Sequence, residues 1–213
     1  MLSSPGVYMD ISYLVSVVKT HSIDAIHPGY GFLSESAAFS QRLWEEAGAV
    51  VIGPGWELLE QMGDKLQAKQ LAARCNVPIL PTVEISTEAL DEAREFSHRA
   101  GYPVMVKAVD GGGGRGIRLV FAPEELSSAV ERAQGESPSR TVFLEKAAVG
   151  GFHHVEVQIV GDGTGQVRHL WERDCSVQRR FQKIVEYAPA ISLNRSVIKN
   201  VINAAIKMAS AVS

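Results

Sequence analysis

The sequence predicts a chain of mixed α/β and α+β architecture, and two observations predict it. Between residues 11 and 52, amphipathic and apolar segments alternate in the order helix, strand, helix, strand, which is typical of part of a parallel sheet. Between residues 102 and 121, two apolar runs rich in β-branched residues flank a loop with five glycines, which predicts a hairpin. With 213 residues, 46% of them hydrophobic, the chain can bury one large core or two small ones.

The first part of the chain is expected to contain a helix at 11–20, a strand at 22–27, a helix at 35–48 and a strand at 49–52. The second helix ends on a glycine, a common stop signal. A parallel sheet of two strands is seldom stable alone. Because the chain also begins inside an α/β pattern and ends on a helix, we expect it to be a fragment of a longer protein.

The second part is expected to hold helices and strands around the hairpin. Helices are predicted at 65–74, 87–100, 124–134 and 194–212, and strands at 141–146, 155–160 and 167–171. Pro78 and Pro81 mark a break before this region. The segment 78–146 is therefore predicted to form a small α+β module between larger parts.

Charge and cysteine content exclude several classes of function. The net charge of −3 does not indicate a nucleic-acid partner. Cys75 and Cys175 lie a hundred residues apart, so we expect no disulfide framework and a reducing compartment. The sequence contains no apolar run as long as a membrane span, and Asp10 interrupts the N-terminal apolar run, so neither a membrane nor a signal peptide is expected.

The glycine-rich loop is the feature most indicative of chemistry. Glycine accepts positive φ and lets backbone N–H groups approach an anion. Gly111, Gly113 and Gly116 fit the dinucleotide pattern G-x-G-x-x-G, but that pattern requires a helix directly afterwards, and the alternating segment 117–121 reads as a strand. We favour a flap that closes over a triphosphate, with Lys107 as a nearby cation. The alternative is a flexible linker, which two flanking strands disfavour.

Six segments resemble, in order, the biotin carboxylase component of biotin-dependent carboxylases, which has an ATP-grasp fold. They are HPGYGFLSE (27–35), MGDK (62–65), VKAVDGGGGRG (106–116), FLEK (143–146), HHVEVQIVGDG (153–163) and ERDCSVQRRFQK (172–183). The resemblance implies the C-terminal part of an N-terminal Rossmann-like, pre-ATP-grasp domain in residues 1–62. It implies an incomplete ATP-grasp domain in residues 63–213, with 78–146 as a mobile lid.

The resemblance also implies roles for individual residues. Lys183 resembles the catalytic lysine near bicarbonate, where a fixed cation would hold a small anion. The resemblance implies that two lysines contact the phosphates of ATP, that the flap covers them, that a pair of residues holds the adenine and ribose, and that two further residues line the site. In that order, these residues are Lys65 and Lys107; Gly112, Gly113, Gly114, Arg115 and Gly116; Glu145 and Lys146; and His154 and Gln178.

Several of these residues also have a purely structural interpretation. A lone lysine is usually a solvated charge, although Lys107 lies in an apolar run where an unpaired charge would be costly. We interpret His153 as structural and Cys175 as a packed thiol. Glu172 and Asp174 read as members of surface ion pairs with little effect on stability.

Two residues depart from the pattern of the family. Phe181 stands where the family commonly has histidine or asparagine, so a polar contact to the nucleotide is lost there. Ala148 stands where a larger aliphatic side chain often lines the adenine pocket. We expect these changes to weaken nucleotide affinity without abolishing it.

The resemblance implies a parent enzyme that uses MgATP and bicarbonate to form carboxyphosphate and then carboxylates biotin. The Mg²⁺ ligands of the family lie beyond the last helix, so no metal ligand is expected in this chain, and little activity is expected of it alone. Implied partners are biotin carrier and carboxyltransferase domains, with a homodimer left open, in the cytoplasm or the mitochondrion.

Two alternatives remain: a non-catalytic truncated nucleotide-binding or interaction module, and an ATP-grasp ligase for another substrate, which segment 172–183 disfavours. The final carboxyl acceptor is left open.

Overall fold

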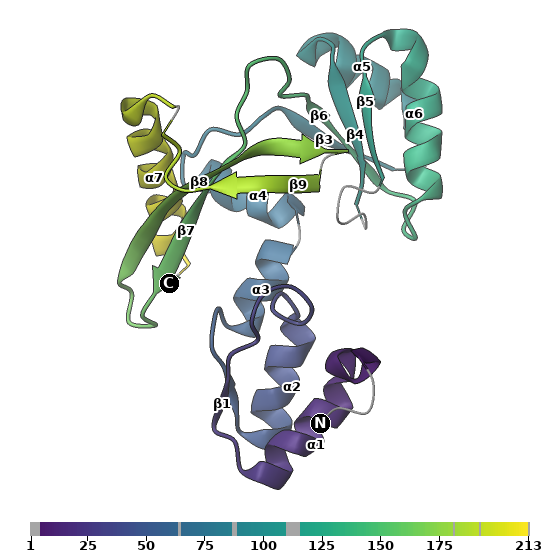
Figure 1. Ribbon diagram of the computed structural model, residues 1–213. Helices are drawn as coiled ribbons and strands as arrows, with labels where there is room; N and C mark the ends of the chain where they lie inside the picture. The colour runs from purple at the N-terminus through teal and green to yellow at the C-terminus, as the bar shows by residue number, and fades with distance from the viewer. Residues whose placement is uncertain are drawn as a thin grey trace. The chain divides into compact units, whose positions relative to one another are not determined.

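The computed structural model describes residues 5–63, 65–86, 89–109, 116–180, 182–191 and 193–212, with Pro5, Lys65 and Leu66 described by their backbone alone. The chain divides into two compact units, Met1–Leu71 and Ala72–Ser213 (Figure 1). Each unit is therefore described by itself. The division expected from the sequence, between residues 62 and 63, remains a prediction.

The first unit is a small α/β layer. Its elements are the 3-10 helix η1 (Pro5–Met9), α1 (Ile11–His21), β1 (Ala25–Ile26), α2 (Ala37–Ala47), β2 (Val50–Val51) and α3 (Trp56–Gly63). Strands β1 and β2 pair in parallel, as the alternating pattern predicted. The buried core between the helices and this sheet consists of Val15, Val18, Phe39, Leu43, Ala49 and Val51. The next helix, α4 (Lys65–Arg74), crosses the boundary between the units.

Local capping explains where the first helices begin and end. The Ser36 side chain accepts a hydrogen bond from the backbone N–H of Phe39 at 3.2 Å, so α2 begins just after Ser36. Gly48 ends the same helix with a φ of +67°. Ser22, predicted as strand, instead caps α1 in the left-handed conformation. The strand predicted at 22–27 is therefore reduced to two residues.

The second unit contains a four-stranded antiparallel sheet in the order β3-β6-β4-β5. Its strands are β3 (Thr82–Ile85), β4 (Val104–Ala108), β5 (Ile117–Val120) and β6 (Val142–Lys146), and its helices are α5 (Leu90–Ala100) and α6 (Pro123–Gly135). The antiparallel pairing of β4 with β5 confirms the predicted hairpin. Both helices pack on the sheet, and the shared core consists of Ile85, Ala93, Phe96, Val104, Val106, Val120, Leu126, Val130, Ala133, Val142 and Leu144.

Side chains alternate between the two faces of this sheet. Along β4, Val104, Val106 and Ala108 are buried, and the first two belong to the core shared with α5 and α6. Met105 and Lys107, between them, are only partly buried and point to the opposite face. The hairpin thus presents Lys107 on the sheet face opposite α5 and α6.

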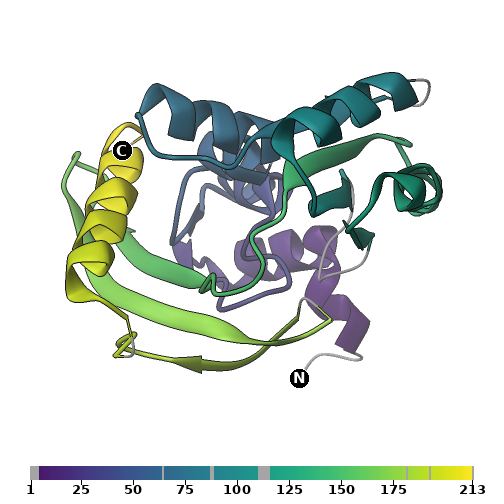
Figure 2. The same cartoon turned by 90° about the horizontal axis from the view of Figure 1, so that it is seen from above.

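A second sheet, of three antiparallel strands, carries most of the remaining predicted site. Its strands are β7 (Val155–Gly161), β8 (Val167–Arg179) and β9 (Gln182–Tyr187), paired in the order β7-β8-β9. Helix α7 (Arg195–Ser210) lies across one face of this sheet in both views (Figures 1 and 2). Ile198 and Ile202 of α7 pack against Val155 and Val157 of β7. In the described part of the chain, no helix combines the length and apolarity needed to cross a bilayer.

Candidate functional site

Lys107 and Glu145 form an ion pair on the face of the four-stranded sheet opposite α5 and α6. Lys107 Nζ of β4 donates to Glu145 Oε1 of β6. Phe143 is the residue directly opposite Lys107, so this pair is a diagonal one across neighbouring strands. The two side chains are 27% and 13% exposed, so the lysine charge is compensated and partly desolvated. An anionic ligand at this face would offer Lys107 a second partner of the same charge as Glu145.

Lys146, the neighbour of Glu145, directs its ammonium group to the other face. Its Nζ donates to the carbonyl oxygens of Gly101 and Tyr102 at 2.9 and 3.0 Å. These carbonyls follow the C-terminus of α5, where a cation is electrostatically favoured. The structure therefore does not bring the Lys146 ammonium group together with Lys107 and Glu145, and its role at an ATP site remains a prediction.

His154 and Gln178, taken from segments far apart in the sequence, line one cavity of about 380 Å³. The other lining residues are Ala148, Phe152, His153, Val155 and Ser176. Gln178 Nε2 donates to the carbonyl oxygen of Cys175 and to His154 Nδ1, both at 2.9 Å. Because Nδ1 accepts a hydrogen bond, the neutral imidazole of His154 carries its proton on Nε2. His154 can therefore act as a hydrogen-bond donor toward a ligand.

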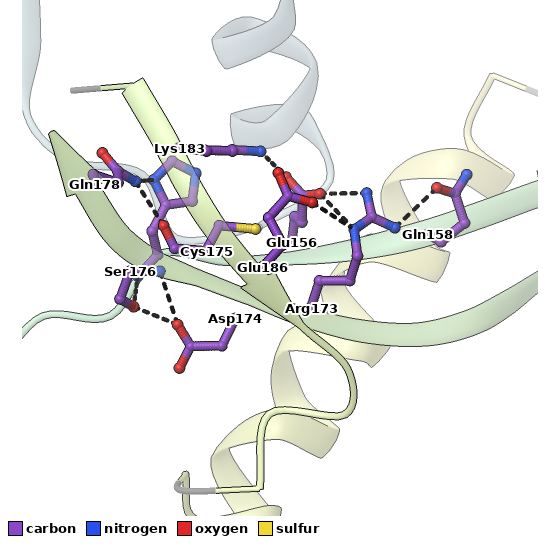
Figure 3. Close-up of polar contacts among 10 residues, drawn as sticks. Glu156, Gln158, Arg173, Asp174, Cys175, Ser176, Gln178, Lys183 and Glu186 are labelled. Carbon is purple, nitrogen blue, oxygen red and sulfur yellow. Dashed lines mark hydrogen bonds and ion pairs between the residues drawn. The ribbon is translucent and has the colours of Figure 1, made fainter. Parts of the chain in front are cut away.

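Lys183 belongs to a charged cluster on the sheet face opposite α7. We define the Glu156 cluster as Glu156, Arg173, Cys175, Lys183 and Glu186. Figure 3 shows the Glu156 carboxylate between Lys183 and Arg173, with an N–O distance of 2.8 Å to Arg173 Nε. Partial burial opposes ionisation of Glu156, but hydrogen bonds from Lys183 and Arg173 outweigh it and lower its pKa. The hydrogen bond to Glu156 raises the pKa of Lys183, so this lysine is a fixed cation at neutral pH.

Cys175 lies at the centre of this cluster with its side chain buried and free of a disulfide. Burial raises the pKa of the Cys175 thiol, and the charge of Glu156 raises it further. The ligand atoms of Glu156, Cys175 and Glu186 all lie within 4.8 Å of one another. A thiol is a poor ligand for Mg²⁺, and Arg173 and Lys183 already balance the two carboxylates, so this donor set does not fit Mg²⁺. The structure agrees with the interpretation of Cys175 as a packed thiol.

Two fully buried carboxylates lie on the opposite face of β8, toward α7. Glu172 Oε1 accepts hydrogen bonds from Arg195 Nη1 at 2.5 Å and from the backbone N–H of Ala190 at 3.2 Å. Asp174 accepts from Ser176 and from the hydroxyl group of Tyr187. The expectation that these carboxylates belong to surface ion pairs is therefore wrong. Helix α7 and the segment before it cover this face, which the local sequence does not reveal.

Asp174 is the most strongly perturbed of these groups. The Ser176 hydroxyl donates to Oδ1 at 2.5 Å, the Ser176 N–H at 2.9 Å, and the Tyr187 hydroxyl donates to Oδ2 at 3.0 Å. The hydrogen bond from the Ser176 hydroxyl is the largest cause of a pKa lowered from 3.8 to about 2. The sequence signal for this local irregularity of β8 is Asp-x-Ser, a spacing at which an aspartate commonly bonds the N–H two residues on.

His153 is a cavity residue as well as a structural one. Its Nδ1 lies 3.3 Å from Asp174 Oδ2, and the residue is one of those that line the cavity with His154 and Gln178. The side chain is 44% exposed, so it is accessible to a ligand. Sequence reasoning could not separate His153 from an ordinary structural histidine, because its partner Asp174 lies 21 residues away on β8.

Several predicted site residues cannot be placed. Gly112, Gly113, Gly114 and Arg115 of the flap, with Phe181, lie outside the described residues. Lys65 begins α4, and only its backbone is described.

Gly116 is the part of the flap that the structure describes. Its φ is +73°, and an added Cβ would lie 2.7 Å from Ala108 Cβ. Only glycine fits where the loop returns to β5.

Two family models match this chain. Residues 64–213 match the family model described as carbamoyl-phosphate synthase L chain, ATP binding domain. Residues 2–59 match the model described as biotin carboxylase, N-terminal domain. Among curated proteins, pyruvate carboxylase of Aspergillus terreus is 44% identical over 212 residues, which cover 98% of this chain and 18% of that protein. Mitochondrial pyruvate carboxylase of Homo sapiens is 43% identical over 206 residues, covering 95% and 17%.

Solved structures give the same result for the three-dimensional fold. Biotin carboxylase of Campylobacter jejuni, solved as a β-γ-ATP complex, superposes with a TM-score of 0.90 at 37% identity, covering 99% of this chain and 48% of that one. The biotin carboxylase domain dimer of Hydrogenobacter thermophilus 2-oxoglutarate carboxylase, in complex with MgADP, ADP and bicarbonate, gives a TM-score of 0.88 at 39% identity. That match covers 100% of this chain and 48% of the other.

Proposed function

Because the chain belongs to the biotin carboxylase family, we propose that it forms part of an enzyme that carboxylates biotin with ATP and bicarbonate. The chain spans about 18% of the length of the curated relatives and about half of the solved biotin carboxylase chains. The complete reaction, through carboxyphosphate, is therefore assigned to the longer protein. The observation that carries the proposal is the convergence of His154 and Gln178 on one cavity, with their donors fixed by hydrogen bonds.

We assign the site at Lys107 to ATP and the site at Lys183 to bicarbonate. Lys107, held by Glu145 on the sheet face opposite α5 and α6, would exchange that carboxylate for phosphate oxygens of ATP. Lys183 and Arg173, both held by Glu156, would present fixed positive charge to bicarbonate. Preorganised charges of this kind stabilise a developing anion without reorganisation at the moment of reaction.

The remaining cofactors and partners follow from the family. Mg²⁺ would neutralise charge on the transferred phosphoryl group, and we expect its ligands outside this chain. Biotin would arrive on a carrier domain, and a carboxyltransferase domain would use the product. We propose a homodimer as one assembly state, supported by the dimer of the Hydrogenobacter thermophilus domain. We propose a cytoplasmic or mitochondrial location, and the mitochondrial relative in Homo sapiens supports the second of these.

Replacing Lys107 with alanine is expected to weaken ATP binding by the purified chain at least tenfold. A hydrogen bond to a charged group contributes about 1.5–3 kcal/mol, and each 1.4 kcal/mol is about tenfold in affinity. Isothermal titration calorimetry with ATP, with and without Mg²⁺, measures the change.

The matched control is Lys199→Ala, which removes an exposed lysine on α7. Equal affinities for ATP in the unaltered chain and Lys107→Ala would contradict the assigned role of Lys107. Failure of a folded chain to bind ATP at all would contradict the proposed nucleotide site.

A second candidate is a nucleotide-binding module without catalysis. It is favoured by the Glu156 cluster, whose donor set does not fit Mg²⁺. We expect the purified chain to release ADP in the presence of bicarbonate at a rate near background. A coupled assay for ADP, with bicarbonate omitted as the control, separates the candidates, because clear bicarbonate-dependent turnover would exclude the non-catalytic module.

A further inference from the structure

The geometry points to Ser176 as a positioning residue of the nucleotide site: we propose that its hydroxyl group keeps one backbone hydrogen bond of the sheet open, so that Gln178 can hold the ring of His154. This inference rests on the proposed nucleotide site and adds a residue that acts on that site through two others. Ser176 belongs to β8, two residues before Gln178, and lines the same cavity.

The chain departs from regular strand pairing directly before β7. Val155 of β7 lies opposite Asp174 of β8, so His154, the residue before β7, lies opposite Cys175. In an antiparallel sheet such a pair can exchange two backbone hydrogen bonds. The Cys175 N–H donates to the His154 carbonyl oxygen at 2.7 Å, but the contacts of the described residues do not include the reciprocal bond, from the His154 N–H to the Cys175 carbonyl oxygen.

Two side chains of β8 take the place of this backbone bond. Ser176 Oγ accepts the His154 N–H at 3.0 Å, and the Gln178 amide donates to the Cys175 carbonyl oxygen at 2.9 Å. Both backbone groups are therefore satisfied. The Gln178 amide has two hydrogens, and the second reaches His154 Nδ1, also at 2.9 Å. The His154 ring is thus held by an amide group whose position depends on the open backbone bond.

The Asp174 carboxylate determines that Ser176 accepts from His154. Asp174 is fully buried, and its Oδ1 receives the Ser176 hydroxyl at 2.5 Å and the Ser176 N–H at 2.9 Å (Figure 3). An ionised carboxylate can only accept hydrogen bonds, so the single hydroxyl hydrogen of Ser176 points to Asp174. The hydroxyl oxygen is left to accept the backbone N–H of His154. These contacts lie where the register of β8 with β9 shifts, between Asp174 and Val177.

Removal of the Ser176 hydroxyl group should separate positioning from stability. In Ser176→Ala the His154 N–H loses its acceptor and can return to the Cys175 carbonyl oxygen as an ordinary sheet bond. Stability should then change little, because one backbone bond replaces one bond to a side chain. The Gln178 amide, however, must compete for that carbonyl oxygen, and its contact with His154 weakens. We therefore expect a loss of ATP affinity without a matching loss of stability.

Calorimetric titration of the full chain with ATP measures the loss of affinity, and urea denaturation measures stability. We expect Ser176→Ala to weaken ATP binding about two- to tenfold, the range for loss of one hydrogen bond. Ser176→Thr keeps the hydroxyl group at an exposed position and should restore the affinity. The matched control is Ser128→Ala, which removes an exposed hydroxyl group on α6 and should leave the affinity unchanged.

A double-mutant cycle distinguishes positioning from a direct contact between Ser176 and the nucleotide. If Ser176 acts through Gln178, then Ser176→Ala should cause no further loss of affinity in a chain that already carries Gln178→Ala. Lys107 belongs to the other sheet of the second unit, so the losses from Lys107→Ala and Ser176→Ala should add.

The tautomer of His154 provides a readout that needs no nucleotide. Because Nδ1 accepts from Gln178, the neutral ring of the unaltered chain should carry its proton on Nε2. Nitrogen-15 NMR of the histidine-labelled chain at alkaline pH measures the tautomer, and the His154 signals are identified by their absence in His154→Asn. Ser176→Ala should shift the ring toward a mixture of tautomers, whereas Ser176→Thr should not.

The outcomes separate this inference from the proposed function. Weaker ATP binding in Ser176→Ala that disappears in the Gln178→Ala background would support it. Lys107-dependent ATP binding that is unchanged in a folded Ser176→Ala, or a loss that adds to that of Gln178→Ala, would overturn it and leave the nucleotide site standing. A neutral His154 ring protonated on Nδ1 in the unaltered chain would overturn it even where a variant fails to fold. Absence of ATP binding by the folded chain would overturn both proposals.

Discussion

Replacement of Arg195 with methionine is expected to lower the free energy of unfolding by about 3 kcal/mol, the typical cost of leaving a buried charge without its partner. Glu172 has no exposed surface, and its Oε1 accepts from Arg195 and from the backbone of Ala190. Burial opposes ionisation of Glu172, but the hydrogen bond from Arg195 contributes to a lowered pKa, so the carboxylate is charged at neutral pH. Urea denaturation at pH 7 measures the loss.

The second oxygen of Glu172 makes the position more sensitive. Glu172 Oε2 is buried, and no residue in the described part of the chain donates a hydrogen bond to it. Methionine retains much of the length of arginine and can cover the same surface, so the expected loss reports the charge and not a cavity.

Two further variants control this experiment. The double variant Glu172→Gln with Arg195→Met removes both charges and should recover a substantial part of the loss, because neutral replacement of a buried pair is often tolerated. Arg132→Met changes an exposed arginine on α6 and should stay within about 0.5 kcal/mol of the original chain. A loss below about 1 kcal/mol in Arg195→Met alone would show that solvent compensates Glu172.

The sequence predicted the elements whose periodicity reflects burial on one side. Helices α1 and α2 show apolar spacing and polar caps, and the structure places both close to the predicted positions. The hairpin of β4 and β5 was predicted because two apolar runs flank the glycines. The ATP-grasp fold implied by six short segments is confirmed by similarity to solved biotin carboxylases at TM-scores of 0.88–0.90.

Three elements could not be read from such patterns. Helix α3 contains no fully buried residue, and β9 is exposed along its entire length, so neither produces a contrast between two faces. Strand β3 follows Pro81 and is only four residues long, which is too short for a reliable alternation. In each case the element is fixed by its neighbours in space and not by its own composition.

The residues of the candidate site show the same distinction between local patterns and contacts from distant segments. Lys107 stood out because a charge within an apolar strand needs a partner, and the structure supplies Glu145. Asp174 and His153 did not stand out, because their pairing depends on strands β8 and β9 and on the loop before β7. The C-terminal half of β8 was missed for a related reason: Glu172 and Asp174 occupy buried positions that normally hold apolar side chains.

Substitution of Asp174 with asparagine is expected to lower the free energy of unfolding by about 2 kcal/mol at pH 7, with a pH dependence that identifies the cause. The pKa of Asp174 is lowered from 3.8 to about 2 in the folded chain, chiefly by the hydrogen bond from Ser176. A shift of one pKa unit corresponds to about 1.4 kcal/mol. Asparagine preserves the shape of the side chain, so the comparison isolates the charge and its acceptor oxygens.

The lowered pKa of Asp174 determines how its contribution to stability changes with pH. A lowered pKa means that the unfolded chain binds the proton more tightly, so the contribution of Asp174 is complete above about pH 4 and is lost as the pH falls toward 2. Urea denaturation at pH 7, 4, 3 and 2 should therefore show the difference between the original chain and Asp174→Asn shrinking across the acidic range. The exposed Asp24→Asn should show little difference at any pH. A difference that stays constant from pH 7 to pH 2 would mean that packing, and not the ionised carboxylate of Asp174, accounts for the loss.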